Sequence, residues 1–336
     1  MRIGLIGAGR IGSFHARVLS RHPEAGSLLV ADADPARASA LADRLGATAA
    51  PDVDAVFSWG VDAVVVACAT PGHAGLVRRA VRAGLPVFCE KPLATDLTRT
   101  LGVLAEVAAA GGVLQLGFMR RFDPGFRTAR ELVRSGALGR LTSVRTMTAD
   151  AAPPGAAYLA GSGGLYRDCL VHDFDMLRWV TGLEVTEVYA TGSDAGPPVF
   201  REAGDIGTAA AVLVLEGGTL AGCTGTRCNG AGYDVRMELS GELDQVSAGL
   251  DDRTPIASTE PQGPPPAGRP WADFLERFAG AYAAELDAFV KLVRGEGTNP
   301  CDGWEGLHAL RIAEACELSR RERRPVPLAE VPTGLP

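Results

Sequence analysis

Hydrophobic positions change their spacing along this chain, and the change divides it into two parts. From residue 1 to about 118, short apolar runs alternate with segments whose apolar residues recur every three or four positions. Strands alternating with helices are typical of parallel βαβ units, so we expect a doubly wound α/β sheet. The expected strands are 3–6, 28–31, 63–67, 86–89 and 113–117, and the expected helices are 11–21, 35–45, 75–83 and 98–110.

Beyond residue 120 the pattern consists of strand-length segments joined by short turns. This favours an α+β domain with a large, mainly antiparallel open sheet. We therefore predict a first domain over residues 1–119 and a second over 120–336, with a C-terminal helix able to pack back on the first. The expected strands are 141–147, 187–191, 208–215, 219–226 and 234–240, followed by helical segments 271–294 and 304–320.

Composition and charge narrow the classes of protein to consider. The 336 residues are 46% hydrophobic and 22% charged with a net charge of −7, which argues against a nucleic-acid or anionic-membrane surface. The apolar run 63–69 is too short to cross a bilayer. Seven scattered cysteines show neither a C-x-x-C motif nor metal-ligand spacing, so we expect free thiols, no metal and a cytoplasmic location.

A glycine-rich turn follows the first expected strand and opens a helix. It consists of Gly7, Gly9 and Gly12, with Arg10 and Ile11 before the third glycine. The first glycine allows a tight turn, the second lets the backbone approach a pyrophosphate, and the third permits close packing of helix on strand. The helix N-terminus favours the negative charge. This context predicts a dinucleotide site.

An acid at the end of the second strand supports that prediction. Asp32 stands where a carboxylate accepts hydrogen bonds from a ribose diol and repels the 2′-phosphate of NADP, so NAD is the expected cofactor. Because an arginine can accommodate that phosphate, Arg10 and Arg37 leave NADP open as a cofactor. An incidental acid beside a glycine turn is the alternative interpretation.

Two further segments are expected near the cofactor. Thr70 and Pro71 follow a buried strand and should lie beside the nicotinamide. His73, at the start of the next helix, caps that helix or touches the cofactor, and taken alone it favours a structural role. The motif Glu90-Lys91-Pro92 ends another strand, and Pro92 stops the ladder there. A lysine is thereby placed at the carboxyl edge of the sheet, where open α/β sheets bind ligands.

A possible acid–base pair lies on the segment 165–180, which has a helical period. Asp168 and His172 are four residues apart and share one face, which Asp175 continues. A histidine can take the proton of an alcohol while hydride leaves, an adjacent carboxylate can orient the ring, and Lys91 can stabilise charge on the oxygen. A helix with a capping aspartate and a half-buried histidine is the alternative.

These motifs, in this order, resemble the Gfo/Idh/MocA oxidoreductase family over essentially the whole chain. The resemblance implies a Rossmann domain, a second domain with a large open sheet, hydride transfer on sugars or polyols, and frequent tetramers. It implies that Lys91, Asp168 and His172 are catalytic and that Glu90 and Lys91 lie in the cofactor site. It is carried by Gly7 to Gly12, by Glu90-Lys91-Pro92-Leu93-Ala94 and by Asp168-x-x-x-His172.

Within the family, the chain most resembles the inositol 2-dehydrogenases, on residues 87–95, 117–123, 232–234 and 271–282. The resemblance predicts NAD-dependent oxidation of myo-inositol or a close relative by a homotetramer or homodimer. The residues expected around the polyol are Met119, Arg120, Asp150, Cys169, Asp175 and Tyr233.

One departure from the family pattern leaves the exact polyol open. Where inositol dehydrogenases usually carry His-Arg-Asn, this chain has Thr148-Ala149-Asp150 followed by Pro153-Pro154-Gly155. A dehydrogenase of a pyranose, a glycoside or an aminocyclitol intermediate is therefore the alternative. A dinucleotide-binding regulator without catalysis is a lesser one.

Overall fold

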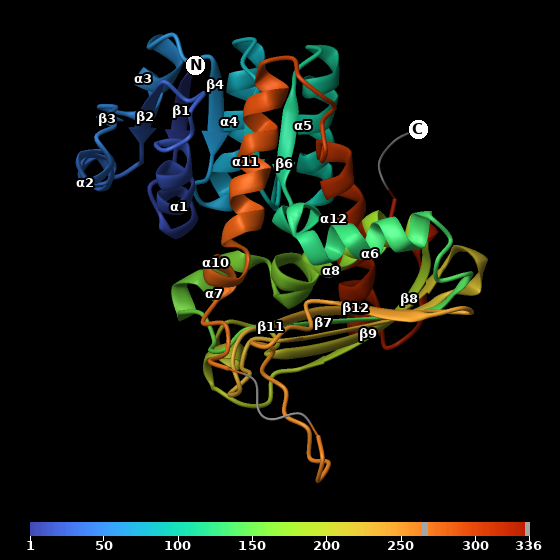
Figure 1. Ribbon diagram of the computed structural model, residues 1–336. Coiled ribbons are helices and arrows are strands. Elements are labelled where there is room, and N and C mark those ends of the chain that lie inside the picture. The colour runs from blue at the N-terminus through green and yellow to red at the C-terminus, as the bar shows by residue number, and fades with distance from the viewer. Residues whose placement is uncertain (264–267, 333–336) are drawn as a thin grey trace. The chain divides into compact units, whose positions relative to one another are not determined.

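The computed structural model describes residues 1–263 and 268–332, and it divides into two compact units (Figure 1). The first unit contains Met1–Met119 and Gly280–Leu307, and the second contains Arg120–Ala279 and His308–Pro332. Residues 280–307 thus belong to the first unit. They lie in the C-terminal region, where we expected from the sequence that a helix could pack back on the first domain.

The first unit is built on a six-stranded parallel sheet with the strand order β3-β2-β1-β4-β5-β6. This order reverses direction between β1 and β4, and it confirms the doubly wound α/β class. Strand β3 was not predicted because it has two residues and no apolar run. The strands are β1 (Arg2–Ile6), β2 (Ser27–Ala31), β3 (Thr48–Ala49), β4 (Ala63–Val66), β5 (Val87–Glu90) and β6 (Leu114–Gly117).

Helices of the first unit cover both faces of this sheet. Helices α1, α2 and α11 share one apolar core with the strands, to which α11 contributes Leu286, Phe289 and Val290, and this core explains why residues 280–307 join the first unit. The helices are α1 (Arg10–Leu19), α2 (Pro35–Leu45), α3 (Val53–Ser58), α4 (Thr70–Arg82), α5 (Leu97–Ala109) and α11 (Ala279–Val293); α12 (Gly303–Glu322) begins in this unit.

Helix α2 shows how local sequence sets these boundaries. The Asp34 side chain accepts a hydrogen bond from the Ala36 amide, and Pro35 occupies the first turn, where its missing amide proton costs nothing. Gly46 ends the helix in the left-handed conformation, with φ +63°. The predicted range 35–45 is therefore confirmed at both ends.

The second unit is built on a seven-stranded sheet with the order β12-β11-β7-β10-β9-β8-β13. Its neighbours are antiparallel, except for the parallel pair β10 and β7. The predicted α+β class is confirmed. The strands are β7 (Leu141–Ala149), β8 (Val185–Ser193), β9 (Thr208–Leu215), β10 (Leu220–Thr226), β11 (Asp234–Gly241), β12 (Gln245–Ala248) and β13 (Val326–Pro327).

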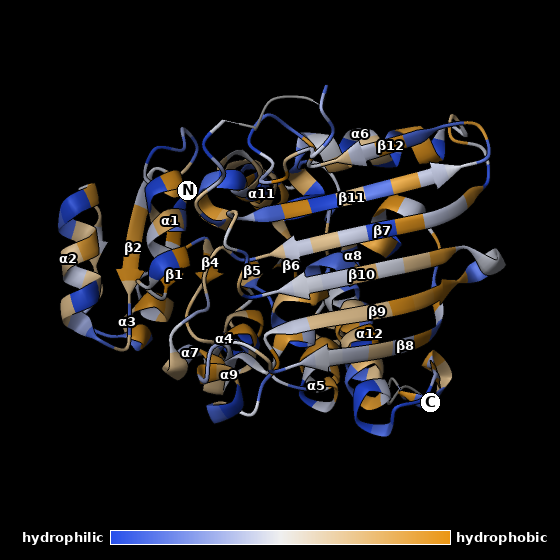
Figure 2. Cartoon of the chain, turned by 90° about the horizontal axis from the view of Figure 1, so that it is seen from below, coloured by the Kyte–Doolittle hydropathy of each residue, from blue (hydrophilic) through white to orange (hydrophobic). Residues whose placement is uncertain are grey.

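One face of this sheet is covered and the other is open (Figure 2). Helices α6 and α8 contact the sheet, and Ser319 of α12 accepts a hydrogen bond from the amide of Ala190 in β8. Burial alternates along β9, as expected of a strand with one solvated face. The remaining helical elements are η1 (Met119–Phe122), α6 (Pro124–Arg134), α7 (Ala156–Ser162), η2 (Tyr166–Leu170), α8 (Val171–Thr181), α9 (Val199–Glu202), η3 (Glu216–Gly218), α10 (Phe274–Arg277) and η4 (Leu328–Glu330).

The segment predicted as one helix over 165–180 has a different local structure. Residues Tyr166–Leu170 form a π-helical segment, and the regular α-helix α8 begins only at Val171. Such a wider turn is rare and changes the angular relation between residues on either side of it. Asp168 lies within the π-helical segment, so the face expected to carry Asp168, His172 and Asp175 is not that of a straight α-helix.

Candidate active site

The glycine turn after β1 has the geometry required for close approach of backbone to backbone. Gly7 has φ +112°, and a Cβ atom there would lie 2.5 Å from the carbonyl carbon of Ala67. A Cβ atom on Gly12 would lie 1.8 Å from the carbonyl oxygen of Gly7. A Cβ atom on Gly9 would meet nothing within 4 Å. The space before the N-terminus of α1 is thus open, as binding of a pyrophosphate there requires.

Asp32 is tied to this turn. Its Oδ2 atom accepts a hydrogen bond of 2.7 Å from the amide of Ala8, and its Oδ1 atom accepts one of 2.9 Å from the amide of Asp34. The guanidinium of Arg37 is 3.8 Å from Oδ1 and largely exposed. Each carboxylate oxygen can accept a further hydrogen bond, so the position fits a ribose diol.

Thr70 and Pro71 follow β4 as predicted, but they already begin helix α4, which was expected only from residue 75. His73 lies in the first turns of that helix and makes contacts to the backbone. His73 is 1% exposed, with Nδ1 2.8 Å from the carbonyl oxygen of Pro92 and Nε2 3.0 Å from that of Cys68. Both ring nitrogen atoms are therefore engaged by the backbone. His73 connects the end of β4 to the peptide that follows Lys91, which opposes a direct contact with the cofactor.

Glu90 ends β5 but its side chain turns to the interior of the first unit. Its Oε1 atom is 2.6 Å from Nε2 of His15 on α1, and both residues are buried. The His15 ring packs edge-on against Phe88 and Tyr282. Glu90 therefore braces the helix that follows the glycine turn, a role the sequence did not reveal. Lys91 comes next in the chain, partly buried.

The strand order brings the predicted cofactor residues to one edge of the sheet. The glycine turn follows β1, Asp32 follows β2, Thr70 follows β4 and Lys91 follows β5. These strands are neighbours and parallel, so their carboxyl ends lie together. In doubly wound sheets, ligands bind beside the point where the order reverses, here between β1 and β4.

Asp168 is held by two residues that the sequence did not predict. Its Oδ1 atom accepts a hydrogen bond of 2.8 Å from the Tyr158 hydroxyl, and its Oδ2 atom accepts one of 3.0 Å from Nη1 of Arg227. His172 follows at the start of α8 and is largely buried. The second unit thus contains Asp168 and His172 on consecutive helical turns, and Lys91 belongs to the first unit.

Tyr158 comes from the short helix α7, in the stretch that we expected from the sequence to differ from inositol dehydrogenases. The residue is 53% exposed, while its hydroxyl reaches the carboxylate of Asp168. Desolvation of the hydroxyl, and next the negative charge of Asp168, raise the pKa of Tyr158 far above its usual value. The hydroxyl therefore stays protonated and acts as a donor.

Arg120 lies in a buried network of polar contacts with Thr148 of β7 and Asp173 of α8. It is 2% exposed; its Nη2 atom donates to the Thr148 hydroxyl over 3.0 Å, and Nη1 lies 3.3 Å from Asp173 Oδ1. The Thr148 hydroxyl donates to Oδ2 of Asp173 over 2.7 Å. Burial raises the pKa of Asp173, and Arg120 and Thr148 oppose that rise. Asp173 was not predicted as part of the site.

The other predicted substrate residues differ in how accessible they are. Asp175 is 0% exposed and forms two parallel hydrogen bonds with Arg121, which opposes a direct contact with a polyol. Cys169 and Asp150 are partly buried and approach each other to 3.8 Å between Sγ and Oδ2. Met119 and Tyr233 are buried.

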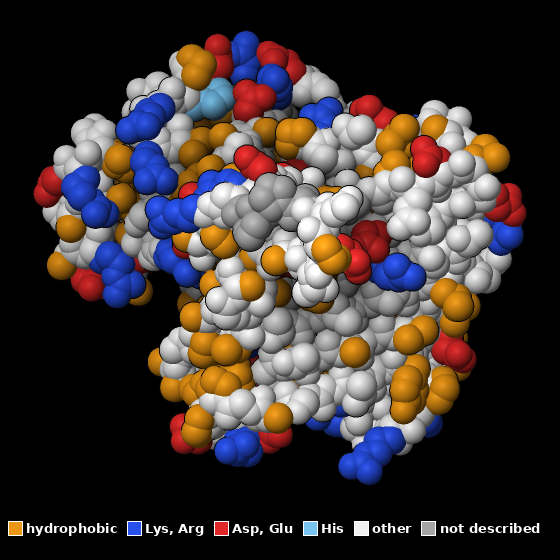
Figure 3. Space-filling model, turned by 60° about the horizontal axis from the view of Figure 1, so that its bottom comes forward, with side chains coloured by type: hydrophobic (Ala, Val, Ile, Leu, Met, Phe, Trp, Pro, Cys, Tyr) orange, Lys and Arg blue, Asp and Glu red, His pale blue; other side chains and the backbone are white. Residues whose placement is uncertain are grey.

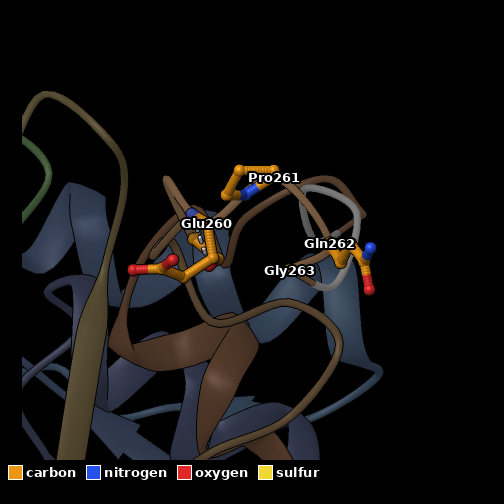
Figure 4. A pocket seen from close by; sticks show the side chains of 5 residues that line it. Glu260, Pro261, Gln262 and Gly263 are labelled. Carbon is orange, nitrogen blue, oxygen red and sulfur yellow. Dashed lines mark hydrogen bonds between the residues drawn. The ribbon is translucent and has the colours of Figure 1, made fainter.

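A hollow elsewhere on the second unit is unrelated to these residues. It lies in the irregular loop after β12 (Figure 4). None of its lining residues belongs to the predicted site. They are Ser258, Glu260, Pro261, Gln262 and Gly263.

The first unit, with its strand order, glycine turn and Asp32, has the features of a dinucleotide-binding Rossmann domain. Family models match both parts of the chain: an oxidoreductase family with an NAD-binding Rossmann fold over residues 1–118, and a GFO/IDH/MocA C-terminal domain over 126–247. The chain belongs to the Gfo/Idh/MocA oxidoreductase family. It is an NAD-dependent oxidoreductase, which confirms the family and the cofactor predicted from the motifs.

Relatives cover nearly the whole chain. A myo-inositol dehydrogenase of Streptomyces leeuwenhoekii is 39% identical over 95% of this chain and 97% of its own length. A myo-inositol 2-dehydrogenase of Thermotoga maritima is 36% identical over 98% and 99%. The crystal structure of a scyllo-inositol dehydrogenase from Lactobacillus casei, with bound NAD(H) and scyllo-inositol, superimposes with a TM-score of 0.86 at 30% identity, over 98% and 99%.

Proposed function

We propose that this protein oxidises a cyclitol hydroxyl, that of myo-inositol or a close relative, to the ketone. The observation that carries the proposal is the pair formed by Asp168 and His172 on consecutive helical turns, with Asp168 fixed through both its oxygen atoms. Full-length relatives named as inositol dehydrogenases support the substrate class.

Each proposed catalytic residue has a distinct role. His172 takes the proton of the reacting hydroxyl, and Asp168 orients the imidazole and stabilises its charged form. Lys91 donates to the oxygen and stabilises the negative charge that develops on it. Bound NAD supplies the hydride acceptor. Arg120, Asp150, Cys169, Met119 and Tyr233 are proposed to surround the polyol, with Asp175 acting through Arg121.

The cofactor residues are proposed on the geometry of the first unit. Gly9 leaves room for the pyrophosphate, and the first turn of α1, with Arg10, Ile11 and Gly12, presents its amides to it. Asp32 accepts from the ribose, while Gly7 holds the turn. Thr70, Pro71 and Lys91 stand at the edge expected for the nicotinamide.

The test is the formation of NADH by the purified protein with NAD and myo-inositol, measured from neutral to alkaline pH. Turnover is expected with myo-inositol or another inositol isomer. Absence of turnover with every inositol isomer would refute the cyclitol assignment. Glucose, xylose, simple glycosides and aminocyclitols belong in the same panel, since preference for one of these would establish the alternative substrate class.

The stretch from Thr148 to Ser162 is the reason to test the alternative substrate class. It carries α7 and the half-exposed ring of Tyr158, whose hydroxyl donates to Asp168. The Lys91→Ala variant, compared with the native protein, separates an enzyme from a regulator without catalysis. For an enzyme, this variant binds NAD normally but loses activity by about 100-fold or more; a regulator would show no NADH formation even with native Lys91.

We further propose that the open sheet face of the second unit joins copies of this chain into a homotetramer or homodimer. Val212, Leu220 and Tyr189 on this face are each about half exposed, and hydrophobic side chains appear among uncharged ones over part of it (Figure 3). Exposed apolar patches of this kind mark interaction sites. Light scattering on the native protein and on Leu220→Glu tests it, because the variant is expected to dissociate.

A cytoplasmic location belongs to the same proposal. All seven cysteines, which lie in the described part of the chain, are free thiols, as expected in a reducing compartment. Among the helices of residues 1–263 and 268–332, none has the length and apolar character needed to cross a membrane. Fractionation of cells that produce the protein tests the location directly.

A further inference from the structure

Arg227 lies between two carboxylates in the interior of the second unit. It directly follows β10 and is 1% exposed. Its Nη1 atom is 3.0 Å from Oδ2 of Asp168, and its Nη2 atom is 3.6 Å from Oδ2 of Asp205. Nη2 also lies 3.5 Å from the hydroxyl of Ser162, at the end of α7. One guanidinium group thereby joins three separate segments.

The position of Arg227 does not depend on Asp168 alone. Its amide donates to the carbonyl oxygen of Gly207 over 2.8 Å, which fixes the backbone at the start of the loop. Asp205 is itself fixed, because its Oδ1 atom accepts from the amides of Ile206 at 2.8 Å and Leu165 at 3.2 Å. The guanidinium is therefore anchored by Asp205 as well as by Asp168.

The charges in this cluster support a fixed role for the arginine. A buried guanidinium is stable only beside negative charge, and here two carboxylates supply it. Although desolvation opposes it, the surrounding negative groups, Asp168 and Asp205 among them, raise the pKa of Arg227. The arginine thus stays charged beside one oxygen atom of Asp168, while the Tyr158 hydroxyl, which stays protonated, donates to the other.

We propose that Arg227 is a positioning residue that, anchored by Asp205, holds the Asp168 carboxylate in the orientation in which it serves His172. This inference rests on the proposed function, since it assigns Arg227 a role through Asp168. Tyr158 occupies the other oxygen atom of Asp168, so the carboxylate cannot rotate without breaking one of the two bonds. A purely structural tie between the loop and the π-helical segment is the competing explanation.

A double-mutant cycle of Arg227→Gln and Asp168→Asn separates the two explanations. If Arg227 acts through Asp168, Arg227→Gln alone lowers kcat by up to about 100-fold, whereas adding it to Asp168→Asn lowers kcat no further. The affinity for NAD is expected to stay unchanged in all three variants. Losses in kcat that multiply would overturn the proposal and leave a structural tie.

Two milder variants cover the case in which Arg227→Gln fails to fold. Arg227→Lys keeps the charge but cannot bridge both carboxylates, so an intermediate loss in kcat is expected. Asp205→Asn removes the anchor and is expected to lower kcat with little change in KM. Native kcat in both variants would contradict the proposal. Arg178→Gln is the matched control, since Arg178 is largely buried on α8 and pairs with Glu184.

A readout without turnover separates failure of this proposal from failure of the proposed function. In NMR spectra of protein with labelled aspartate carboxyls, the Asp168 signal is identified by its loss in Asp168→Asn. Because an adjacent positive charge favours the ionised carboxylate, Arg227→Gln should move this titration upward by about one pH unit or more. An unmoved titration would refute the assignment even if the protein oxidises inositol. A moved titration without turnover on any polyol would refute only the substrate.

Discussion

Oε1 of Glu90 lies 2.6 Å from Nε2 of His15, inside the first unit and 75 residues away along the chain. The pair joins the end of β5, which precedes Lys91, to the helix that follows the glycine turn. A buried hydrogen bond between side chains that can each carry charge is costly to break, because the remaining partner keeps its desolvation cost. The cofactor turn and the lysine are thus parts of one braced core.

His15→Leu is therefore expected to lower the free energy of unfolding by about 1–3 kcal/mol, since it leaves the Glu90 carboxylate buried without this partner. Urea denaturation measures the change, and the KM for NAD should rise because α1 is less well fixed. His22→Gln is the control, since His22 pairs with Asp287, whose side chain is 44% exposed, and loss of such a partly exposed pair should cost less than about 1 kcal/mol. Equal losses in the two variants would contradict the bracing role.

Substitution by alanine should affect stability at Gly12 and NAD binding at Gly9. In Gly12→Ala the new methyl group would lie 1.8 Å from the Gly7 carbonyl oxygen, so the turn must open, at a cost of about 3 kcal/mol or more. In Gly9→Ala the methyl group meets nothing within 4 Å, so stability should stay within about 1 kcal/mol while NAD binding weakens. Thermal unfolding and NAD titration measure the two effects. Undiminished NAD binding by Gly9→Ala would place the pyrophosphate elsewhere.

Removal of the Tyr158 hydroxyl should affect chemistry more than folding. Tyr158→Phe deletes the donor to Oδ1 of Asp168 while the half-exposed ring keeps its place. We expect kcat to fall about tenfold, because a hydrogen bond to a charged group contributes about 1.5–3 kcal/mol. Tyr189→Phe, on the open sheet face, is the control for loss of a tyrosine hydroxyl. A native kcat for Tyr158→Phe would show that Arg227 suffices to hold Asp168.

Cys68, which follows β4, should resist alkylation at neutral pH. Burial raises the pKa of its thiol to about 11. Because only the thiolate reacts, its reactive fraction at pH 8 is about one in a thousand, and it rises about tenfold with each pH unit up to the pKa. Mass spectrometry after treatment with iodoacetamide measures this. Cys228, which is exposed, serves as the internal comparison; if Cys68 is labelled as fast as Cys228 at pH 8, the burial of its thiol is contradicted.

The local part of the architecture could be predicted from sequence, because short-range patterns determine it. The strands that flank the glycine turn, the capped helix 35–45 and the placement of Lys91 after β5 all follow from residues near one another in the chain. Strands β3 and β13 have two residues each and carry too few positions for a pattern.

The site residues that the sequence did not reveal are held by contacts between separate segments of the chain. Tyr158 is ten residues from Asp168, and Arg227 is 59 residues from it. Asp205 contacts Arg227 from a further segment, and nothing in the immediate sequence of these residues marks them. His73 and Glu90 were recognised as notable, but their partners are a backbone carbonyl of Pro92 and the distant His15. The π-helical segment was missed because its apolar spacing resembles that of an α-helix.

The two ends of the seven-stranded sheet have a consequence for how copies of this chain can associate. The edge strands of the sheet are β12, which has four residues, and β13, which has two. Pro327 in β13 has no amide proton to donate. Short margins of this kind offer little template for pairing with a strand of another molecule. Growth by continuous addition of strands, as in a fibril, is therefore disfavoured along β12 and β13. The association of copies proposed above therefore relies on the broad surface of the sheet, which suits a finite, symmetric particle.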